Sequence, residues 1–336
     1  MFYLLKVQTM DSFNFAATTM PAALDWDGVA YANNIWVAIG FSDTGAENIV
    51  AWSDDGITWN AGSGAYAATY TWTKPVWNGT FWAVNTHGAS PNKGMTSSDG
   101  KAWTQHNLAG TAFSINNTPG MIAVGSTFIA TRGLARNEIY SSTDGYTWTE
   151  QVDVLPDDTV TWCGLATNGT ITVAVQGYPS GTSNKAASIL NANLPGGVWT
   201  VRTLPATSNW LHVIWTGNCF FATTFGSPTT GARSYDGITW ESLTLPSTAA
   251  GFTITLYGTP VAEGNGTIIL PVTYTTGNAA RNRCHTSYDD GTTWTERTLT
   301  ETDRWDAAAS DGNKVVIIAN FDAGSGSTRA QYSSGR

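Results

Sequence analysis

The chain has 336 residues and a net charge of −9, with only 12% charged residues, 16 tryptophans and 35 glycines. The acidic balance argues against a nucleic-acid partner, because such partners require basic side chains that neutralise phosphates. The apolar run at residues 2–7 is too short to cross a bilayer, so we expect no membrane insertion.

The chain divides into a short extension, residues 1–10, and one domain, residues 11–336. No linker, charge block or low-complexity tract interrupts the second part, and an unbroken repeat favours a single domain. The first residues contain no basic segment followed by a long apolar core, so we expect no secretory signal peptide.

Seven units follow one another, and each begins with two apolar runs around a tight polar turn. Asn and Gly tolerate the positive φ angles of such turns, so each pair of runs predicts two antiparallel strands. The turns lie at residues 33–34, 78–79, 125–126, 168–169, 217–218, 265–266 and 311–312.

A second pattern follows in five of the units, where a short phrase such as Ser-Asp-Asp-Gly-Ile-Thr-Trp returns roughly every 40 to 55 residues. Asp-Gly between β-formers predicts a hairpin that the Ser and Asp side chains close and the Trp covers. Because the phrase is copied, we assign its residues to the scaffold and not to catalysis or metal binding. They are Asp55 and Trp59, Asp99 and Trp103, Asp144 and Trp148, Asp236 and Trp240, and Asp289 and Trp294.

This phrase resembles the Asp-box, or BNR, repeat of sialidase-like β-propellers. The copy with Ser287, Asp289, Gly291, Thr293 and Trp294 has the usual spacing, and the other four are one residue shorter. The unit at residues 168–199 has lost its box. The resemblance implies a fold and leaves the activity open.

The chain is therefore predicted to be all-β, a seven-bladed β-propeller of four-stranded antiparallel blades. Phe15 precedes Trp26 by 11 residues, as Trp199 precedes Trp210 and Trp294 precedes Trp305. We therefore expect the N-terminal strand to close the last blade beside the strand that ends near Ser333.

Cys163, Cys219 and Cys284 fall in apolar strands of three different units, which predicts buried free thiols. The four histidines show no ligand spacing, so we expect no metal site and no cofactor.

Variable connections at one end of the ring are the expected binding region, because binding residues gather on loops of a rigid scaffold. The arginines there favour an anionic or sugar ligand, with solubilising charge as the alternative. An aromatic residue opens most units, either to stack on sugars or, because it repeats in register, to pack between blades. The candidate ligand-binding residues are Trp72, His87, Arg132, Arg136, Tyr178, Tyr274, Arg281 and Arg283.

A sialidase would need an arginine cluster and a Phe/Tyr-Arg-Ile-Pro segment near the start, and no arginine precedes Arg132. Another glycosidase would need two facing carboxyl groups, for which Asp27 and Asp306 are the best candidates. Each follows the opening Trp of its unit. The alternative is that these acids cap strands or pair with Arg304.

The Gly/Thr/Asn/Trp-rich composition is similar to that of phage tail and receptor-binding proteins. We therefore expect a non-enzymatic virion protein, tail-associated or receptor-binding, that engages a host-surface glycan or other virion proteins and forms oligomers through assembly. Its expected location is the virion. The alternatives are a glycoside hydrolase or lectin on the same scaffold, and an assembly factor like those of photosystem II, which carry similar repeats.

Overall fold

The computed structural model describes residues 13–41, 49–65, 70–86, 93–108, 120–132, 136–177, 179, 181–278, 281–320 and 327–334. Within these ranges there is no α-helix, and the regular elements are β-strands with two 3₁₀ turns, η1 (Asn191–Asn193) and η2 (Thr276–Asn278). None of these elements is a helix long and apolar enough to span a membrane. The fold is all-β, as the composition predicts.

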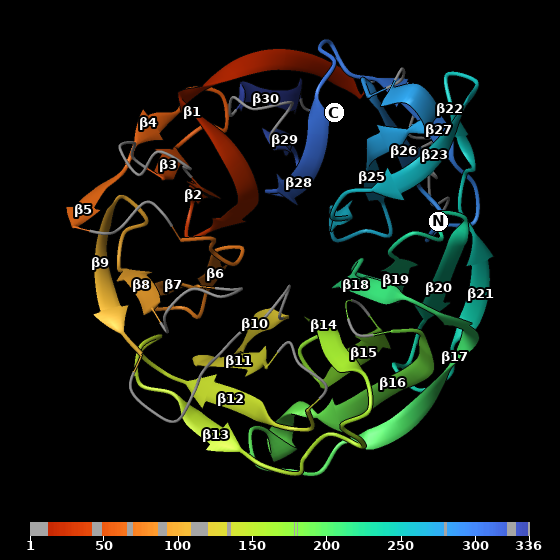
Figure 1. Cartoon of the computed structure of the whole chain (residues 1–336). Coiled ribbons are helices and arrows are strands. Elements are labelled where there is room, and N and C mark those ends of the chain that lie inside the picture. Colours follow the sequence, from red (N-terminus) through yellow and green to blue (C-terminus); the bar gives the residue numbers. More distant parts are fainter. Residues whose placement is uncertain are drawn as a thin grey trace, which may run out of the picture.

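Five hydrogen-bonded sheets surround a central axis (Figure 1). The first joins the two ends of the chain in the order β28 (Arg304–Ser310), β29 (Val315–Asn320), β30 (Ser327–Ser334), β1 (Asn14–Ala32), β2 (Ile35–Phe41), β3 (Val50–Ser53), β4 (Asn60–Ala61). The second contains β5 (Ser63–Ala65), β9 (Ala102–Asn107), β8 (Lys93–Ser97), β7 (Trp82–Asn85) and β6 (Val76–Trp77).

The other three sheets complete the circuit. The third contains β10 (Met121–Val124), β11 (Thr127–Thr131), β12 (Ile139–Ser142) and β13 (Thr149–Gln151). The fourth contains β14 (Thr161–Thr167), β15 (Ile171–Gly177), β16 (Ser183–Leu190), β17 (Thr200–Ser208), β18 (Trp210–Trp215), β19 (Phe220–Thr224), β20 (Thr230–Ser234) and β21 (Glu241–Thr244). The fifth contains β22 (Thr248–Ala249), β23 (Phe252–Tyr257), β24 (Val261–Ala262), β25 (Ile268–Thr275), β26 (Arg283–Ser287) and β27 (Thr295–Thr298).

Strand β1 closes the ring by serving two neighbours. Its first half pairs antiparallel with β30, and its second half pairs with β2. Phe15 lies opposite Ser333, as the spacing of the aromatic residues predicts. Pairing the two termini in one sheet removes the open edge that each would otherwise expose.

The tight turns between the first two strands of the units are formed as predicted. Asn33 and Asn34 have φ angles of 51° and 59°, and Gly79, Gly217 and Gly312 have φ angles of 90° or more. Side chains without glycine's freedom are strained in this region. The polar turn residues of the sequence therefore set where the first strand of a unit ends and the second begins.

The repeated Ser-Asp-Gly hairpins share one hydrogen-bond pattern. In the first copy, the Ser53 hydroxyl donates to Asp55 Oδ1 at 2.9 Å and accepts from the Gly56 amide at 2.8 Å. The same carboxylate oxygen accepts from the amides of Ile57 and Thr58, both at 2.7 Å. The Ser and Asp side chains thus close the turn from inside, as expected of residues that compete for local backbone groups.

Each of these hairpins also packs against a neighbouring unit through its glycine. A Cβ on Gly56 would approach Val316 to 3.1 Å, and one on Gly100 would approach Val37 to 2.8 Å. Gly145 and Gly237 meet the preceding strands in the same way, at Ala83 and Val173. The repeated residues therefore join neighbouring units, which accounts for their recurrence.

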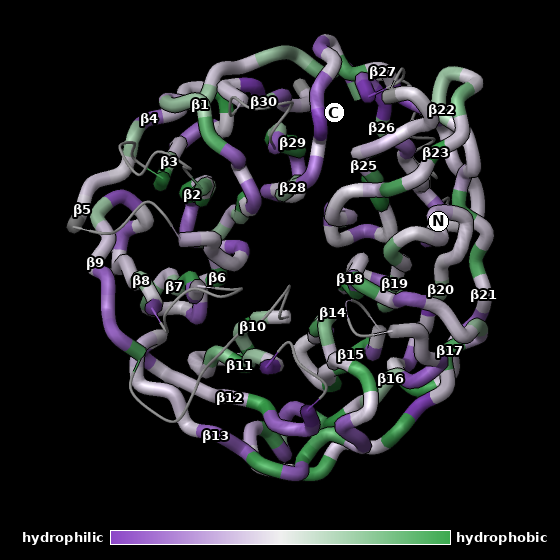
Figure 2. Tube along the Cα trace, in the orientation of Figure 1, coloured by the Kyte–Doolittle hydropathy of each residue, from purple (hydrophilic) through white to green (hydrophobic). Residues whose placement is uncertain are grey.

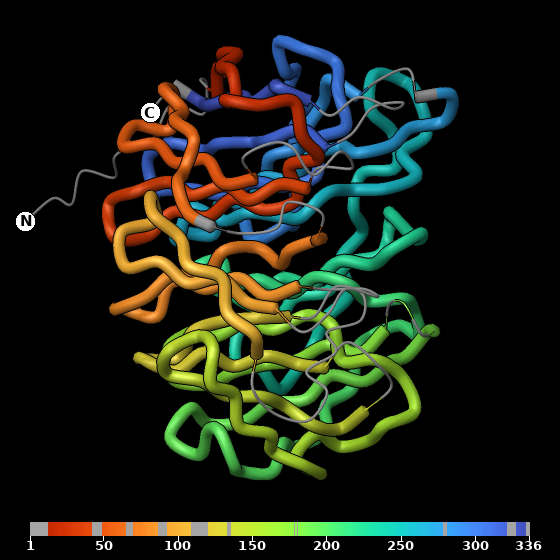
Figure 3. Tube along the Cα trace, turned by 60° about the vertical axis from the view of Figure 1, so that its left-hand side comes forward, coloured from red at the N-terminus to blue at the C-terminus, as the bar shows by residue number. Residues whose placement is uncertain are grey.

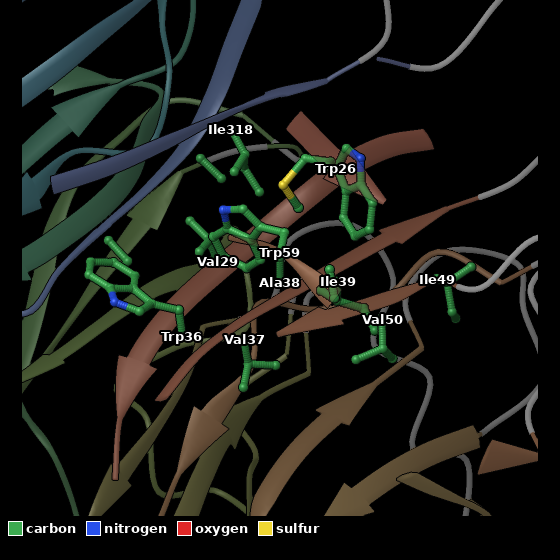
Figure 4. Packing of buried hydrophobic residues seen from close by; sticks show 14 of the residues in the cluster. Trp26, Val29, Trp36, Val37, Ala38, Ile39, Ile49, Val50, Trp59 and Ile318 are labelled. Carbon is green, nitrogen blue, oxygen red and sulfur yellow. The ribbon is translucent and has the colours of Figure 1, made fainter. Parts of the chain in front are cut away.

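The core lies between the units, where large side chains of one unit meet those of the next. Trp26, Trp36 and Val50 cluster with Ile318 from the other end of the chain (Figure 4). Apolar residues line strands such as β2, β11 and β29 in the hydropathy view (Figure 2). Cys163, Cys219 and Cys284 are free and buried, as predicted.

Candidate functional site

The ring has two ends that differ in their connections (Figures 1 and 3). We call the end with the tight turns and the Ser-Asp-Gly hairpins, such as residues 33–34 and 53–56, the turn end. The opposite end, where β2, β25 and β29 finish at Phe41, Thr275 and Asn320, is the loop end. The candidate site lies at the loop end.

A bulge in each of two inner strands sets one residue apart at this end. The register of β1 against β2 shifts between Trp26 and Gly28, and that of β28 against β29 shifts between Trp305 and Ala307. Asp27 and Asp306 are the extra residues. A bulge leaves its extra residue outside the regular ladder and re-aims its side chain.

Asp27 and Asp306 come together through Asn320. The Asn320 side-chain amide donates to Asp27 Oδ1 at 2.7 Å and also hydrogen-bonds Asp306. The guanidinium of Arg304 lies 3.0 Å from Asp306 Oδ2. The two acids are thus neighbours, as their equivalent positions predict, and Asp306 pairs with Arg304, as the structural alternative predicts.

The surroundings favour the protonated form of Asp27. Burial is the main cause, and the nearby carboxylates of Asp306 and Asp25 add to it, raising the pKa of Asp27 to about 8. Burial also raises the pKa of Asp306, although Arg304 opposes this shift. Near neutral pH, Asp27 therefore presents a neutral carboxylic acid beside the Asp306–Arg304 ion pair.

Tyr274 joins this group from the neighbouring sheet. The guanidinium carbon of Arg304 lies 5.0 Å from the centre of the Tyr274 ring, within the range of a cation–π contact. We call Asp27, Tyr274, Arg304, Asp306 and Asn320 the acidic cluster. It brings one predicted ligand-binding residue, Tyr274, into the same set of contacts as the two predicted carboxyl groups.

A second polar group at the loop end contains Lys74 and His212. The His212 ring nitrogens lie 3.5 Å from the hydroxyls of Thr223 and Thr259. Burial, and then the charge of Lys74, lowers the pKa of His212 to about 4. The pKa of Lys74 is itself lowered by burial. His212 is therefore neutral at physiological pH.

Trp72 is a correction to the predicted site. Its side chain is only 1% exposed and belongs to the core cluster that contains Trp26 and Trp36. The aromatic residues that open the other units, including Trp162, Trp210 and Trp305, are buried too. These rings pack between sheets, as the alternative predicts, because the closed ring surrounds the first strand of every unit.

Two of the four predicted arginines are engaged with acids of their own unit. Arg132 lies 3.7 Å from Glu138, and Arg283 lies 3.0 Å from Glu296. Arg281 is half-buried and Arg136 is exposed. His87 and Tyr178, the remaining predicted residues, lie outside the described ranges. Arg132 and Arg283 therefore take part in separate ion pairs.

A polar groove of about 360 Å³ lies at the turn end, lined by hydroxyls of Ser141, Thr147 and Thr149, by Asp144 and by Pro195. It occurs where the unit at residues 168–199 lacks a Ser-Asp-Gly hairpin. Asp144 Oδ1 already accepts three hydrogen bonds, from Ser142, Tyr146 and Thr147. Among the described residues, no group of three His, Cys, Asp or Glu side chains is placed to hold a metal ion.

Comparison with known proteins defines the fold. No protein-family model and no curated protein sequence matches the chain. Among solved structures, YCF48 bound to D1 peptide superimposes with a TM-score of 0.68 at 13% identity, over 97% of both chains. The chain has a β-propeller fold. A catalytically inactive virginiamycin B lyase from Staphylococcus aureus with quinupristin gives a TM-score of 0.69 at 10% identity, over 96% of this chain and 100% of the other.

The β-propeller domain of Swd1 from Myceliophteria thermophila gives a TM-score of 0.66 at 8% identity, over 96% of this chain and 100% of that domain. Identities this low establish the propeller fold and no shared activity.

Sequence reasoning did not identify Lys74 and His212. Both stand two residues after a buried opening Trp, Trp72 or Trp210, at the position that Gly28 and Gly164 occupy elsewhere. Aligning the opening strands on their Trp residues would therefore have shown that Lys74 and His212 replace glycine at this position.

Proposed function

We propose that this β-propeller is a non-enzymatic binding protein of a phage virion, tail-associated or receptor-binding. It engages a host-surface glycan or other virion proteins through its loop end, and it oligomerises through virion assembly. The observation that carries the proposal is the non-repeating polar set at the loop end, held on a scaffold whose repeated residues are used for structure. The virion location rests on the composition alone.

We infer further that the ring has seven blades. The pairings support four-stranded groups β1–β4, β6–β9, β10–β13, β14–β17 and β18–β21, then β23–β27 with a split inner strand, and finally β28–β30 with the first half of β1. The Ser-Asp-Gly hairpins are then Asp-boxes, a proposal supported by their shared side-chain hydrogen bonds.

The geometry of the acidic cluster disfavours hydrolysis of a glycosidic bond. Glycosidases place their two carboxyl groups about 5 to 10 Å apart, with the scissile bond or a water between them. Here the Asn320 amide binds both Asp27 and Asp306, so it occupies that space. We therefore assign these acids to holding the first and last inner strands together.

A glycoside hydrolase is the second candidate function, and one observation favours it. A carboxylic acid that stays protonated near neutral pH is a suitable proton donor, and the pKa of Asp27 is about 8. A lectin on the same scaffold differs from our proposal only in its biological setting.

A glycan array combined with an assay for reducing-sugar release tests the proposal. We expect the unmodified protein to bind glycans without releasing reducing sugar. We expect the same result for Asp27→Asn and Asp306→Asn. Asp54→Asn, at an exposed turn-end side chain, is the matched control. Release that Asp27→Asn abolishes would establish the hydrolase instead.

The virion assignment needs its own measurement. Mass spectrometry of purified particles should find the chain in stoichiometric amounts, and antibodies should label the tail. Detection only in the soluble fraction of the lysate would contradict this part of the proposal.

A further inference from the structure

The polar groove at the turn end lies where two neighbouring units meet. It is lined by residues of β11, β12 and β13 and by Pro195, and Figure 1 shows β10–β13 beside β14–β17. Ile129 of the first unit shares a core cluster with Trp162 and Trp199 of the second. The groove is therefore the polar end of a contact whose remainder is an apolar core.

In other units, the hairpin of the next unit covers the corresponding surface. A Cβ on Gly100 would lie 2.8 Å from Val37 and 3.4 Å from Ile35, both in the second strand of the preceding unit. The unit after β10–β13 has Leu-Pro-Gly-Gly at residues 194–197 in place of a Ser-Asp-Gly hairpin. The start of β11 is therefore left open, and the groove occupies this position.

The lining of the groove is polar where the covered surfaces are apolar. A Cβ on Gly237 would lie 3.4 Å from Ile171, so Ile171 is covered in the same way as Ile35. Thr127 stands two residues before Ile129, as Ile35 stands two residues before Val37. The uncovered unit therefore carries a hydroxyl at the position where these two covered units carry isoleucine.

Three hydroxyl groups face the groove from one side of the sheet. Ser141 lies opposite Ile129 on β11 and opposite Thr149 on β13, and opposite residues in a sheet point to the same face. Thr127 shares this face because it is two residues away from Ile129. Thr127, Ser141 and Thr149 all line the groove, and none of their hydroxyls bonds to a residue that the structure describes.

Ser141 gives the clearest indication of a ligand. It is only 7% exposed, and its side chain lines the groove without a partner among the described residues. Thr96 has the equivalent position in β8, and its hydroxyl lies 2.8 Å from His106 Nε2. A hydroxyl removed from most of its water without a partner costs free energy. A ligand that hydrogen-bonds Ser141 would recover this free energy.

The charge of the groove argues against an ionic ligand. Asp144 is the one charged residue among the described residues that line it. Burial raises the pKa of Asp144, but hydrogen bonds from the amides of Thr147 and Tyr146 outweigh burial and hold this pKa below its ordinary value. An anion would therefore be repelled, and a wholly apolar ligand would leave the hydroxyls unpaired. An uncharged ligand with many hydrogen-bonding groups fits best.

We propose that this groove is a binding site for a neutral sugar. Serine and threonine hydroxyls both donate and accept hydrogen bonds, as the hydroxyls of a sugar do, and the Pro195 ring offers an apolar surface to the sugar's C–H groups. Its volume of about 360 Å³ falls within the range of about 300–1,000 Å³ for small-molecule sites. The site goes beyond the proposed function, which places binding at the opposite end of the ring.

Nuclear magnetic resonance titration of the full chain tests the groove, with glucose, galactose and N-acetylglucosamine as probes. We expect at least one of these sugars to shift the backbone amide signals of Thr127, Ser141 and Thr149. Glucuronate should bind about tenfold more weakly than that sugar, because its carboxylate is repelled by Asp144.

Thr149→Val and Thr104→Val form a matched pair of variants. Both threonines are exposed, and they have equivalent pairings, Thr149 with Ser141 and Thr104 with Thr96. Thr149→Val should weaken sugar binding about fivefold, the loss of one neutral hydrogen bond, and Thr104→Val should leave binding unchanged.

Ser141→Ala provides a second variant with a second measurement. It should also weaken sugar binding about fivefold. It should not lower the thermal unfolding temperature of the sugar-free protein, because no hydrogen bond within the described residues is lost. A clear loss of stability would show that the Ser141 hydroxyl serves the fold and not a ligand.

Three results would overturn the proposal. One is the absence of shifts at the groove amides with all three sugars, and another is equal sugar affinity in Ser141→Ala, Thr149→Val and the unmodified protein. Glucuronate binding as tight as that of the best neutral sugar would overturn the ligand class. So would a hairpin peptide of sequence Ser-Asp-Asp-Gly-Ile-Thr-Trp that shifts the groove amides when the sugars do not.

The groove and the proposed function fail independently. Glycan-array binding that is unchanged in Ser141→Ala and Thr149→Val, without shifts at the groove amides, overturns the groove site alone. Sugar-dependent shifts at the groove, with no glycan bound on the array and no chain in virions, overturn the proposed function alone.

Discussion

At the turn end, five hairpins repeat one set of hydrogen bonds, whereas at the loop end each opening strand carries a different pair of residues after its aromatic. Asp27 and Gly28 follow Trp26, while Leu211 and His212 follow Trp210. The residues repeated at the turn end maintain the contacts between neighbouring units. The residues that vary at the loop end include half-buried side chains such as Asp27 and buried ones such as Cys163. Residues that repeat from unit to unit therefore belong to the scaffold, and residues that differ between units form the candidate site.

The largest expected effect on stability comes from a substitution that disrupts a contact between two units at the turn end. In Gly217→Ala, the new Cβ would lie 2.0 Å from the Gly264 carbonyl oxygen at a φ of +96°, so backbone must move. We expect a loss of about 3 kcal/mol or more in the free energy of unfolding, measured by urea denaturation.

The equivalent turn in another unit provides the control for this change. Gly125 also has a positive φ, +58°, but a Cβ there meets nothing within 4 Å. Gly125→Ala should cost about 1 kcal/mol, the backbone contribution alone. Equal losses for the two variants would show that contacts between units do not stabilise this end.

At the loop end, Asp27→Asn should stabilise the protein. The folded-state pKa of Asp27, about 8, is above its ordinary value of 3.8, so folding takes up a proton between these values. Stability from this group is complete below pH 3.8 and is lost as pH rises through 8. Asparagine does not ionise, and its side-chain oxygen can still accept the bond from Asn320.

We therefore expect Asp27→Asn to match the unmodified protein near pH 4 and to be about 2 kcal/mol more stable at pH 8, after allowing for solvent screening. Urea denaturation across this pH range measures the difference. A constant difference at all pH values would show that Asp27 does not change its protonation on folding.

A hairpin carboxylate should behave in the opposite sense. Asp289 accepts from the Ser287 hydroxyl at 2.8 Å and from the Thr293 amide at 2.8 Å. Burial raises the pKa of Asp289, but these hydrogen bonds outweigh it and hold the pKa below 3.8. Asp289→Ala should cost about 1 kcal/mol at pH 7, as measured by thermal unfolding.

Because the folded pKa of Asp289 is depressed, its contribution is present above pH 3.8 and is lost as pH falls through the folded value. The cost of Asp289→Ala should therefore shrink in acid. Asp54→Ala, at a side chain that is 70% exposed, should change stability by less than about 0.5 kcal/mol. A cost for Asp289→Ala that does not depend on pH would contradict the stabilising role of its charge.

The smallest effect on stability is expected within the loop end itself. Arg136 is exposed, and Arg136→Ser should change the free energy of unfolding by less than about 0.5 kcal/mol. Arg132→Ser removes the partner of Glu138, 3.7 Å away, and should cost more. Differential scanning calorimetry compares the two, and equal costs would show that the Arg132 ion pair is not stabilising.

Much of the architecture follows from local patterns. The hairpins require only neighbouring Ser, Asp and Gly, and the positions of Phe15 and Trp26 placed β1 beside β30. The proximity of Asp27 and Asp306 was predictable for the same reason, since both follow an opening Trp in units that close the ring. The burial of Trp72 was not predictable, because it depends on which side chains of other strands cover the ring.

The sequence alone determined the propeller units and their tight turns, because these depend on backbone preferences and hydrogen bonds between residues close in the chain. The sheet that the two termini share was predictable from the spacing of the aromatic residues, although its paired residues, such as Phe15 and Ser333, lie far apart in the chain. Only the tertiary structure decided that Asn320 joins two carboxyl groups. Such contacts depend on how sheets distant in the chain are oriented around the axis. No local pattern encodes that orientation, because it results from the packing of every side chain between the sheets.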